Sequence, residues 1–356
     1  MQNGKKFTLS VVGGGVGGRL SMDGIKDSPM FELKAATDIR PETCKELEQK
    51  YTGIRTFTDH KEMFAKCPTD VVCVSTYPPS HEPITMDALK LPLKGILVEK
   101  PLGHTAASGR AILEAVRKKG IPMAVPHGML VKKVPTEVIE RVCRGDIGEL
   151  KLIEIENDKW DIINAGIHWL NWTVNLLNNE PFKYVMASID AGTRTFRDGM
   201  QVETHAATYA ETRSGIRVVM NTGDYVTVNT KGHGTLFRIV GMLGVIEFYG
   251  WEDSYYIFNR EFPEGKTIKP EEFPVKGHRA HLENMVRMIE TGKISYAVPE
   301  SSLTALEICE AAYVSGKNKC MVTFPFEKFK IPASVNWDPG QPYSGKDGGR
   351  DGRKLK

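Results

Sequence analysis

The sequence lacks the features that mark several classes of protein. Its six cysteines include no Cys-x-x-Cys pair, which argues against a zinc site or a disulfide framework. No apolar run approaches the ~18 residues of a membrane span, and the segment after Met1 does not resemble a secretory leader. The chain has no large excess of one charge, because its 47 Lys and Arg residues nearly balance its 44 Asp and Glu residues, for a net charge of +3. We therefore expect a cytoplasmic protein with reduced thiols and with no metal, membrane or nucleic-acid partner.

What the chain does contain is a regular alternation of strand-like and helix-like segments over its first third. Short apolar runs, which predict buried strands, alternate with amphipathic stretches of helical length. The predicted strands are 7–12, 31–37, 70–75, 95–98 and 121–125. This alternation is typical of an α/β doubly wound parallel sheet with helices on both faces. Residues 1–125 are thus predicted to form a Rossmann domain.

The pattern changes after Pro126. A helix at 136–144, a strand at 150–156 and an amphipathic helix at 163–177 precede several strands joined by short turns. Those strands are predicted at 184–189, 204–211, 217–221, 235–240 and 245–249. The pattern favours an α+β domain with a large, mainly antiparallel open sheet over residues 126–330. Residues 331–356 are a Pro/Gly-rich tail that either reaches a neighbouring subunit or pocket or is a disordered end.

A glycine-rich turn follows the first predicted strand and opens a helix. Gly13, Gly15 and Gly18 satisfy the spacing G-x-G-x-x-G, with Val16 and Gly17 between them. Glycine lets the backbone approach a pyrophosphate, and the free N–H groups of the helix N-terminus favour the anion. Asp38 follows Gly18 by 20 residues, where a carboxylate binds the ribose hydroxyls of NAD. We expect NAD, although Arg40 beside Asp38 leaves NADP open.

Five further motifs resemble the glucose–fructose oxidoreductase/inositol dehydrogenase (Gfo/Idh/MocA) family. Glu99-Lys100-Pro101 resembles its Glu-Lys-Pro motif, and Ser75–His81 resembles its loop after the fourth strand, where Thr76 and His81 match and Tyr77 replaces a proline. The other three are Gly145–Glu149, Asn164–His168 and Ala311–Ser315. The resemblance covers residues 8 to about 325. It implies a cofactor site that includes Thr76, Tyr77, His81, Glu99 and Lys100, and a polyol-like substrate.

Lys100 is the first predicted catalytic residue. Oxidising an alcohol requires a group that takes the hydroxyl proton and a cation that stabilises the developing alkoxide. Lys100 directly follows the strand at 95–98, and ligands of open α/β sheets bind at the carboxyl ends of strands. The family resemblance implies that Lys100 lies against the substrate and the nicotinamide ribose.

His168 is the predicted general base. Apolar residues of the helix at 163–177 recur at helical spacing, whereas Asn164, His168, Asn171 and Asn175 form a separate polar stripe. Imidazole suits proton transfer near neutral pH, and the amides of the stripe suit the hydroxyl groups of a sugar.

Asn164 departs from the family pattern, which has Asp at this position. An amide forms hydrogen bonds but holds no negative charge, so the usual carboxylate–histidine pairing is absent from residue 164. Asp161 is expected to lie too far from His168 to replace it directly. Either His168 acts without a carboxylate, or Lys100 is the main proton acceptor. Lys100, His168 and Asn164 remain the predicted catalytic group.

Several other residues are candidates for binding the substrate. His127 and Trp160 are predicted to contact it, together with Lys100, Asn164 and His168. Lys132 is a secondary candidate. Trp169, Trp172 and Tyr77 either stack on the apolar face of a sugar or pack in the core.

The sequence therefore predicts an NAD(P)-dependent oxidoreductase acting on CH–OH groups. The expected reaction is hydride transfer at a secondary ring hydroxyl of a sugar or glycoside, with C3 of a glucosyl unit as a candidate position. The alternatives are an inositol dehydrogenase, a reductase of keto-sugars or imines, and, from another class, a catalytically silent NAD-binding sensor.

A homo-oligomer is expected through the sheet of the second domain. The predicted helices leave one face of this sheet uncovered, and the candidates for that face are all apolar. They are Val218, Met220, Phe237, Ile239 and Phe248. The family resemblance implies that this face packs against another subunit, giving dimers, tetramers or larger assemblies.

Overall fold

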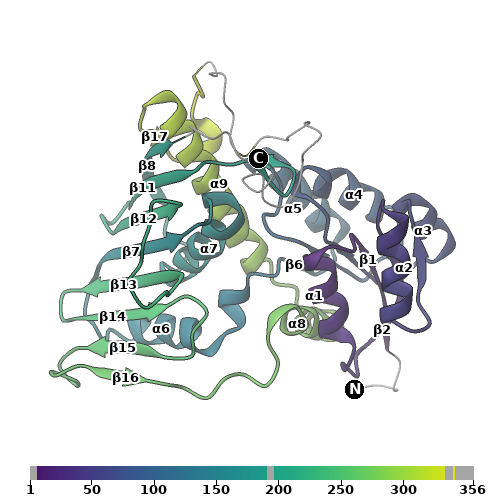
Figure 1. Ribbon diagram of the computed structural model, residues 1–356, viewed down its shortest axis with the longest axis horizontal. Coiled ribbons are helices and arrows are strands. Elements are labelled where there is room, and N and C mark those ends of the chain that lie inside the picture. The colour runs from purple at the N-terminus through teal and green to yellow at the C-terminus, as the bar shows by residue number, and fades with distance from the viewer. Residues whose placement is uncertain (1–5, 191–195, 333–339, 341–356) are drawn as a thin grey trace. The chain divides into compact units, whose positions relative to one another are not determined.

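The computed structural model describes residues 6–190, 196–332 and 340. The chain forms two compact units (Figure 1). Unit 1 contains residues 1–128 and 275–303, and unit 2 contains residues 129–274 and 304–356. The sequence predicts one continuous second domain over 126–330, whereas in the structure the segment 275–303 packs with the N-terminal residues.

Unit 1 is built on the predicted parallel sheet. Its six strands are β1 (Phe7–Val12), β2 (Phe31–Thr37), β3 (Arg55–Phe57), β4 (Val71–Val74), β5 (Gly95–Val98) and β6 (Met123–Ala124). They lie in the order β3-β2-β1-β4-β5-β6, and every neighbouring pair is parallel. Every residue of β4 and β5 is buried, as expected for strands covered on both faces. The strand order reverses between β1 and β4, and ligands of such folds bind at the carboxyl ends of strands near this point.

The helices of unit 1 include one that comes from late in the chain. The first five are α1 (Val16–Ile25), α2 (Pro41–Lys50), α3 (His60–Lys66), α4 (His81–Ala88) and α5 (Ala106–Lys119). The late helix is α8 (Gly277–Thr291), which packs against α1. Its Leu282, Met285 and Val286 lie in the same hydrophobic core as Leu9 and Val71. A Cβ on Gly95 would lie 2.5 Å from Met285 Sδ, so β5 and α8 are in close contact.

Unit 2 contains a sheet of nine strands and a separate hairpin. The large sheet has the order β16-β15-β14-β13-β7-β12-β11-β8-β17 (Figure 1). Its strands are β7 (Leu150–Asp158), β8 (Phe182–Asp190), β11 (His205–Thr212), β12 (Arg217–Gly223), β13 (Thr235–Gly241), β14 (Gly244–Tyr249), β15 (Tyr255–Phe258), β16 (Lys266–Ile268) and β17 (Val322–Thr323). All neighbouring strands are antiparallel except β7 and β12. The hairpin consists of β9 (Phe196–Arg197) and β10 (Met200–Gln201).

Helices cover one face of the large sheet. They are α6 (Lys133–Cys143), α7 (Ile167–Leu176) and the part of α9 (Ala297–Asn318) that begins at Thr304. Trp172 of α7 packs edge-on against Phe237 and Phe248, with ring centroids 5.1 and 5.2 Å apart. The prediction that Val218, Met220, Phe237, Ile239 and Phe248 occupy an uncovered face is therefore wrong. All five are at most 2% exposed, because the strand register points them toward the helices.

The opposite face of this sheet carries the alternate residues. Register pairing aligns one row across seven strands: Met186, Tyr209, Val219, Glu154, Arg238, Glu247 and Tyr256. Met186 and Tyr256 are 41% and 39% exposed, and Arg238 forms ion pairs with Glu247 and Glu154. This face therefore combines apolar side chains with charge pairs.

The remaining fold-level findings concern thiols and helix length. All six cysteines are free thiols, and three of them are buried. Within the described ranges, none of the helices combines the length and the apolar character needed to cross a bilayer.

Candidate active site

The glycine turn between β1 and α1 has the close packing that its sequence predicts. Gly13 has a φ of +104°, and a Cβ there would lie 2.3 Å from the carbonyl oxygen of Ser75. A Cβ on Gly18 would lie 1.8 Å from the carbonyl oxygen of Gly13. Around Gly15, in contrast, a Cβ would meet no atom within 4 Å. Gly13 and Gly18 are thus required by the fold, whereas Gly15 leaves open space at the N-terminus of α1 where a pyrophosphate fits.

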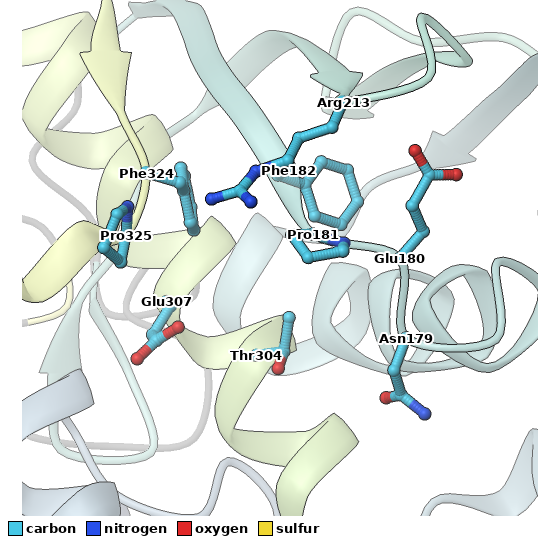
Figure 2. Close-up of a pocket in the computed structure, with 9 residues that line it drawn as sticks. All are labelled: Asn179, Glu180, Pro181, Phe182, Arg213, Thr304, Glu307, Phe324 and Pro325. Carbon is cyan, nitrogen blue, oxygen red and sulfur yellow. The ribbon is translucent and has the colours of Figure 1, made fainter.

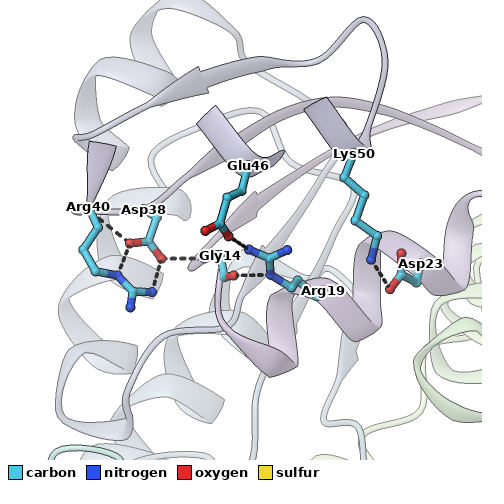
Figure 3. Close-up of polar contacts among 7 residues, drawn as sticks. All are labelled: Gly14, Arg19, Asp23, Asp38, Arg40, Glu46 and Lys50. Carbon is cyan, nitrogen blue, oxygen red and sulfur yellow. Dashed lines mark hydrogen bonds and ion pairs between the residues drawn. The ribbon is translucent and has the colours of Figure 1, made fainter. Parts of the chain in front are cut away.

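Asp38 follows β2 and lies beside this turn (Figure 3). Its Oδ2 accepts a hydrogen bond from Gly14 N at 2.9 Å, and its Oδ1 accepts from Nε of Arg40 at 2.9 Å. Burial opposes ionisation of Asp38, but the hydrogen bonds from Arg40 and Gly14 outweigh it and lower the pKa of the carboxyl. The Asp38 carboxylate, predicted to bind the ribose, is therefore ionised and already paired with Arg40. The Arg40 side chain remains 58% exposed.

The pairing of Asp38 with Arg40 predicts that one substitution can shift the cofactor preference from NADH toward NADPH. Asp38→Asn removes the negative charge but keeps an acceptor for Gly14 N, and it leaves Arg40 without its carboxylate partner. We expect the affinity for NADPH relative to NADH to rise about tenfold, on the scale of one charge interaction at a partly exposed site. The measurement is fluorescence titration of both reduced cofactors. Arg40→Met is the control and is expected to lower the relative affinity for NADPH. An unchanged ratio in Asp38→Asn would show that the cofactor 2′ position lies elsewhere.

The loops after β4 and β5 are joined by a buried histidine. The ring nitrogens of His81 lie 3.0 Å from the carbonyl oxygen of Pro101 and 2.9 Å from that of Thr76. His81 is fully buried, and burial lowers its pKa, so the ring is neutral and donates to one of the two carbonyls at a time. His81 therefore holds the loops together, whereas Tyr77 is 47% exposed beside them.

Glu99 connects these loops to the glycine turn. Its side chain is buried, and a Cβ on Gly17 would lie 2.7 Å from its Oε1. Glu99 Oε2 accepts a hydrogen bond from the backbone N–H of Lys100 at 3.1 Å. Burial raises the pKa of Glu99, although the neighbouring Lys100 opposes this shift. Lys100 is thus connected, through the carboxyl of its neighbour, to the glycine turn.

Sequence reasoning missed a residue of this group, His278 in α8. Its Nε2 lies 3.4 Å from Glu99 Oε1, and its Nδ1 lies 2.8 Å from Oγ of Ser21. Burial, with the charge of Lys100, lowers the pKa of His278 to about 4, so the ring is neutral near neutral pH. The two histidines of Gly277-His278-Arg279-Ala280-His281 at the start of a helix were the available signal, but nothing local relates them to Glu99.

His127, predicted to bind substrate, is fully buried in unit 1. Its Nε2 lies 2.8 Å from Oγ of Ser302, and its carbonyl oxygen lies 3.2 Å from Nε2 of His281. Burial, with His281 and Lys100, lowers the pKa of His127 well below its ordinary value. The structure therefore places His127 in a buried cluster with other histidines.

The predicted residues of unit 2 lie around a π-helical turn, Ile162–Gly166, which precedes α7. Asp161 caps this turn, because its Oδ1 accepts from Asn164 N at 2.7 Å and from Asn164 Nδ2 at 3.0 Å. π-Helical turns within helices are frequent at functional sites. Asn164 is 3% exposed. Asp161 was expected to lie too far from His168 to replace the missing carboxylate directly. In the structure it binds Asn164.

A second buried carboxylate holds the same turn. Glu203 Oε1 accepts from Ile162 N at 2.7 Å, and Glu203 Oε2 accepts from Tyr313 OH at 2.8 Å. Burial, together with the nearby Asp161, raises the pKa of Glu203 to about 7. Sequence reasoning gave no role to Glu203.

Glu203 predicts a pH-dependent stability. Its folded pKa lies above its ordinary value of 4.5, so the folded state holds a proton that the unfolded state releases. The stabilisation is complete below about pH 4.5 and is lost as the pH rises through about 7. We expect the free energy of unfolding of Glu203→Gln to increase relative to wild type between pH 5 and pH 8, measured by urea denaturation. A constant difference across this range would contradict the prediction. The surface variant Glu46→Gln is the control.

The C-terminal tail has one described residue beyond residue 332. Gly340 N donates a hydrogen bond to the carbonyl oxygen of Gln201 at 2.7 Å. A Cβ on Gly340 would lie 3.2 Å from the ring of Tyr313. At this position the tail therefore contacts the β9–β10 hairpin of its own chain. The rest of the predicted tail after residue 332 lies outside the described residues.

His168 lies among aromatic side chains at the start of α7. The ring of Trp251 is edge-on to it with centroids 5.7 Å apart, and Trp169 is tilted at 6.1 Å. Trp251 is 49% exposed, and its carbonyl oxygen accepts a hydrogen bond from Lys132. The structure thus brings His168 and Lys132 close to Trp251, which sequence reasoning did not single out.

The other predicted aromatics divide into core and surface. Trp169 and Trp172 are 2% and 0% exposed, and their indole N–H groups donate to Asn157 and to the carbonyl of Pro135. They are therefore core residues, one of the two possibilities that the sequence left open. Trp160 is 40% exposed. Within the polar stripe, Asn171 is fully buried, and its carbonyl accepts from Asn175 Nδ2 at 2.8 Å.

A surface pocket of unit 2 lies away from all these residues. It encloses about 210 Å³, and its walls include Phe182, Phe324 and Arg213 (Figure 2). No predicted site residue lines it. Among the residues that the structure describes, no group of three or more His, Cys, Asp or Glu side chains is arranged to hold a metal ion.

Comparison with known families identifies the N-terminal residues. Residues 7–127 match the Gfo/Idh/MocA family model, described as an oxidoreductase family with an NAD-binding Rossmann fold. These residues are similar to the NAD-binding Rossmann domain of that family, and they contain the glycine turn, Asp38, the loop with His81, and Glu99-Lys100.

One relative is similar in sequence. An uncharacterized oxidoreductase, YrbE of Bacillus subtilis (strain 168), is 25% identical to this chain over 158 residues. The matched part is 42% of this chain and 44% of YrbE, so the alignment spans less than half of the relative.

Solved structures share the fold over most of the chain. An aldose–aldose oxidoreductase from Caulobacter crescentus, complexed with glycerol, has a TM-score of 0.76 and 19% identity, covering 90% of this chain and 100% of that one. Levoglucosan dehydrogenase with NADH and levoglucosan has a TM-score of 0.75 and 17% identity, with the same coverage. A putative NADPH-dependent oxidoreductase from Desulfitobacterium hafniense has a TM-score of 0.76 and 15% identity, covering 90% and 98%. At these identities the similarity shows that the fold is shared.

Proposed function

We propose that this protein is an NAD(P)-dependent oxidoreductase that transfers a hydride at a secondary ring hydroxyl of a neutral sugar or glycoside. The observation that carries the proposal is the contact of Glu99 with Gly17, which ties Lys100 to the nucleotide-binding turn. The structural similarity to levoglucosan dehydrogenase and to an aldose–aldose oxidoreductase supports a carbohydrate as the substrate. C3 of a glucosyl unit is our candidate position.

The glycine turn fits a dinucleotide, because the space at Gly15 is open and α1 begins there. When bound, the nicotinamide accepts the hydride that leaves the substrate carbon. The residues of this chain supply the rest of the reaction. The ammonium of Lys100 stabilises the developing alkoxide, and a basic side chain takes the hydroxyl proton as the carbonyl forms.

Two side chains are candidates for the proton acceptor. His168 has the suitable chemistry but contacts aromatic rings, and Asp161 binds Asn164. Lys100 is the other candidate, acting in its neutral form. A pH profile of kcat/KM separates them, because His168→Asn removes the lower apparent pKa of the profile only when His168 is the base.

We favour NAD over NADP because Asp38 is ionised beside the glycine turn, and a carboxylate repels a 2′-phosphate. Because Arg40 is exposed, NADP is the second candidate. A structure with bound NADH and one described as NADPH-dependent both share the fold. The free state of all six thiols is consistent with a reducing compartment, and we infer the cytoplasm.

We also infer that the protein forms a homo-oligomer through the outward face of the unit 2 sheet. The exposed Met186, Tyr256 and Phe258 lie on strands of this sheet, where a second copy would cover them. We expect light scattering at micromolar concentration to give at least the mass of a dimer, and Val219→Lys to lower it. A wild-type monomer would refute this inference.

The decisive experiment is a cofactor-reduction screen over neutral sugars, glycosides and inositols, followed by absorbance of the reduced nicotinamide. We expect NAD⁺ reduction with at least one glucosyl compound. Turnover with inositol alone would favour the inositol dehydrogenase. Reduction of keto-sugars without detectable oxidation would favour the reductase. Tight NADH binding with no turnover of any compound would favour the silent sensor.

A further inference from the structure

A buried ion pair lies beside the π-helical turn that carries Asn164. Asp161 and Arg197 are 2% and 4% exposed, and Arg197 Nη1 lies 2.8 Å from Asp161 Oδ2. Buried ion pairs contribute little net stability, because the desolvation of both charges offsets their attraction. Stability alone is therefore a weak reason for this pair to be present.

The two oxygens of Asp161 have different partners. Oδ2 binds Arg197, whereas Oδ1 accepts both the backbone N–H and the side-chain Nδ2 of Asn164. An ionised carboxylate can only accept, so the amide atom of Asn164 that faces Asp161 must be the nitrogen. The amide oxygen of Asn164 is thereby turned away from Asp161. The ion pair thus determines which group Asn164 presents on its other side.

Arg197 also supports Trp160. Its guanidinium lies 4.1 Å from the centroid of the indole ring, a cation–π contact, and the ring is 40% exposed. Arg197 comes from the β9–β10 hairpin, whose two-residue turn is Asp198-Gly199. Both turn residues have positive φ, 49° and 77°, as a type I′ turn requires. One arginine therefore contacts the partner of Asn164 and a half-exposed aromatic ring.

We propose that Arg197 and Asp161 are positioning residues for substrate recognition by unit 2. Through them the β9–β10 hairpin fixes the amide of Asn164 and the ring of Trp160 as one recognition surface for a neutral polyhydroxylated ring. The amide oxygen accepts a hydrogen bond from a ring hydroxyl, and the indole contacts the apolar face of the sugar. This inference rests on the proposed function and adds the residues that set its substrate recognition.

Two double variants test the orientation of Asn164 without leaving a buried charge unpaired. Asp161→Asn/Arg197→Met keeps an acceptor oxygen for the amide of Asn164, whereas Asp161→Leu/Arg197→Met removes it. Thermal unfolding and the Kd for NADH report whether each variant is folded. The side-chain ¹⁵N–¹H signals of Asn164, identified by their loss in Asn164→Asp, report its order without any substrate. The surface variant Arg144→Met, which loses an exposed ion pair with Asp146, is the matched control.

We expect both double variants to bind NADH within about twofold of wild type, because the cofactor site is formed by unit 1. The Leu/Met variant should lose the dispersed, ordered amide signals of Asn164. Its kcat/KM for the sugar found in the screen should fall about 10- to 100-fold, the scale of small misplacements in a site. The Asn/Met variant should keep the signals and lose less activity.

Arg197→Lys tests the support of Trp160 separately. Lysine keeps the charge opposite Asp161 but lacks the planar group that stacks on the indole. We expect KM to rise severalfold with kcat nearly unchanged, because contacts to non-reacting parts of a sugar bind ground state and transition state alike. A fall in kcat with an unchanged KM would contradict this role.

The outcomes separate this inference from the proposed function. If the wild type turns over a neutral sugar and the two folded double variants have equal kcat/KM, the positioning role is overturned and the proposed function stands. If the wild type binds NADH but oxidises and reduces no sugar, the proposed function fails, and the substrate-positioning role fails with it.

Discussion

Lys100→Met is expected to lower kcat by about 10²- to 10⁴-fold, the range that a single acid–base or electrostatic group contributes. Methionine is unbranched and only one atom shorter than lysine, and it removes the ammonium. The backbone N–H of residue 100 still donates to Glu99, so the loop keeps its connection to the glycine turn. We therefore expect the Kd for NADH to change little. Stopped-flow measurement of cofactor reduction, together with NADH fluorescence titration, gives both quantities.

Lys90→Met is the matched control for this change. Lys90 is a surface lysine of the same unit, 75% exposed and paired with Asp87. Its loss should leave kcat within the experimental error. Normal turnover by Lys100→Met would remove Lys100 from the catalytic group and leave His168 as the candidate. If Lys100→Met loses both NADH binding and turnover, Lys100 instead has a role in holding the cofactor.

Substitutions in the glycine turn are expected to give the second large effect. Gly15→Ala should lose cofactor affinity but keep its stability, whereas Gly18→Ala should lose stability. Gly15→Ala places a methyl group in open space in the unliganded chain, so its melting temperature should match wild type. The same methyl group points to the space for the pyrophosphate, and we expect the Kd for NADH to rise at least tenfold, on the order of 1.4 kcal/mol. Differential scanning fluorimetry and NADH titration measure the two properties.

Gly18→Ala should instead destabilise the protein. Its Cβ would lie 1.8 Å from the carbonyl oxygen of Gly13, which is backbone and can move only with the turn itself. We expect a loss of several kcal/mol in the free energy of unfolding, or failure to fold, as for other overpacked sites. If Gly18→Ala is as stable as wild type, or if Gly15→Ala binds NADH normally, the assignment of the turn to the cofactor pyrophosphate is wrong.

The sequence was sufficient for most of unit 1 because its signals are local. The strands at 7–12, 31–37 and 95–98 agree with β1, β2 and β5, since a buried parallel strand is a short apolar run bounded by helical periodicity. The turn at Gly13–Gly18 and the distance to Asp38 follow from spacing along one strand–helix–strand unit. The short β3 was missed, because three residues are too few to show a period.

The faces of the unit 2 strands could not be assigned from the sequence. In β12 Val219 lies between Val218 and Met220, and in β13 Leu236 and Val240 share a face with Arg238. Because apolar residues occur on both faces of these strands, the pattern alone did not tell which face the helices cover. Packing against Trp172 of α7 decides it, and Phe237 points inward.

The candidate site shows the same division. Lys100 and the predicted cofactor residues were singled out by motifs, whereas His278 and Arg197 were not. Their partners, Glu99 and Asp161, lie 179 and 36 residues away along the chain. The Asp198-Gly199 turn that brings Arg197 into place carried a hairpin signal, but the strands flanking it are two residues long.

The amino-acid sequence by itself determined the order of the elements of unit 1, the glycine turn and the place of Lys100 just after β5, because each depends on residues that are neighbours along one short segment. Only the tertiary structure decided that α8 belongs to the first unit, which residues of the large sheet are covered, and which charged groups hold Asn164 and Glu99. Those outcomes depend on contacts between segments that are distant along the chain. The packing of whole helices and strands decides which segments meet, and buried charges require partners wherever they lie.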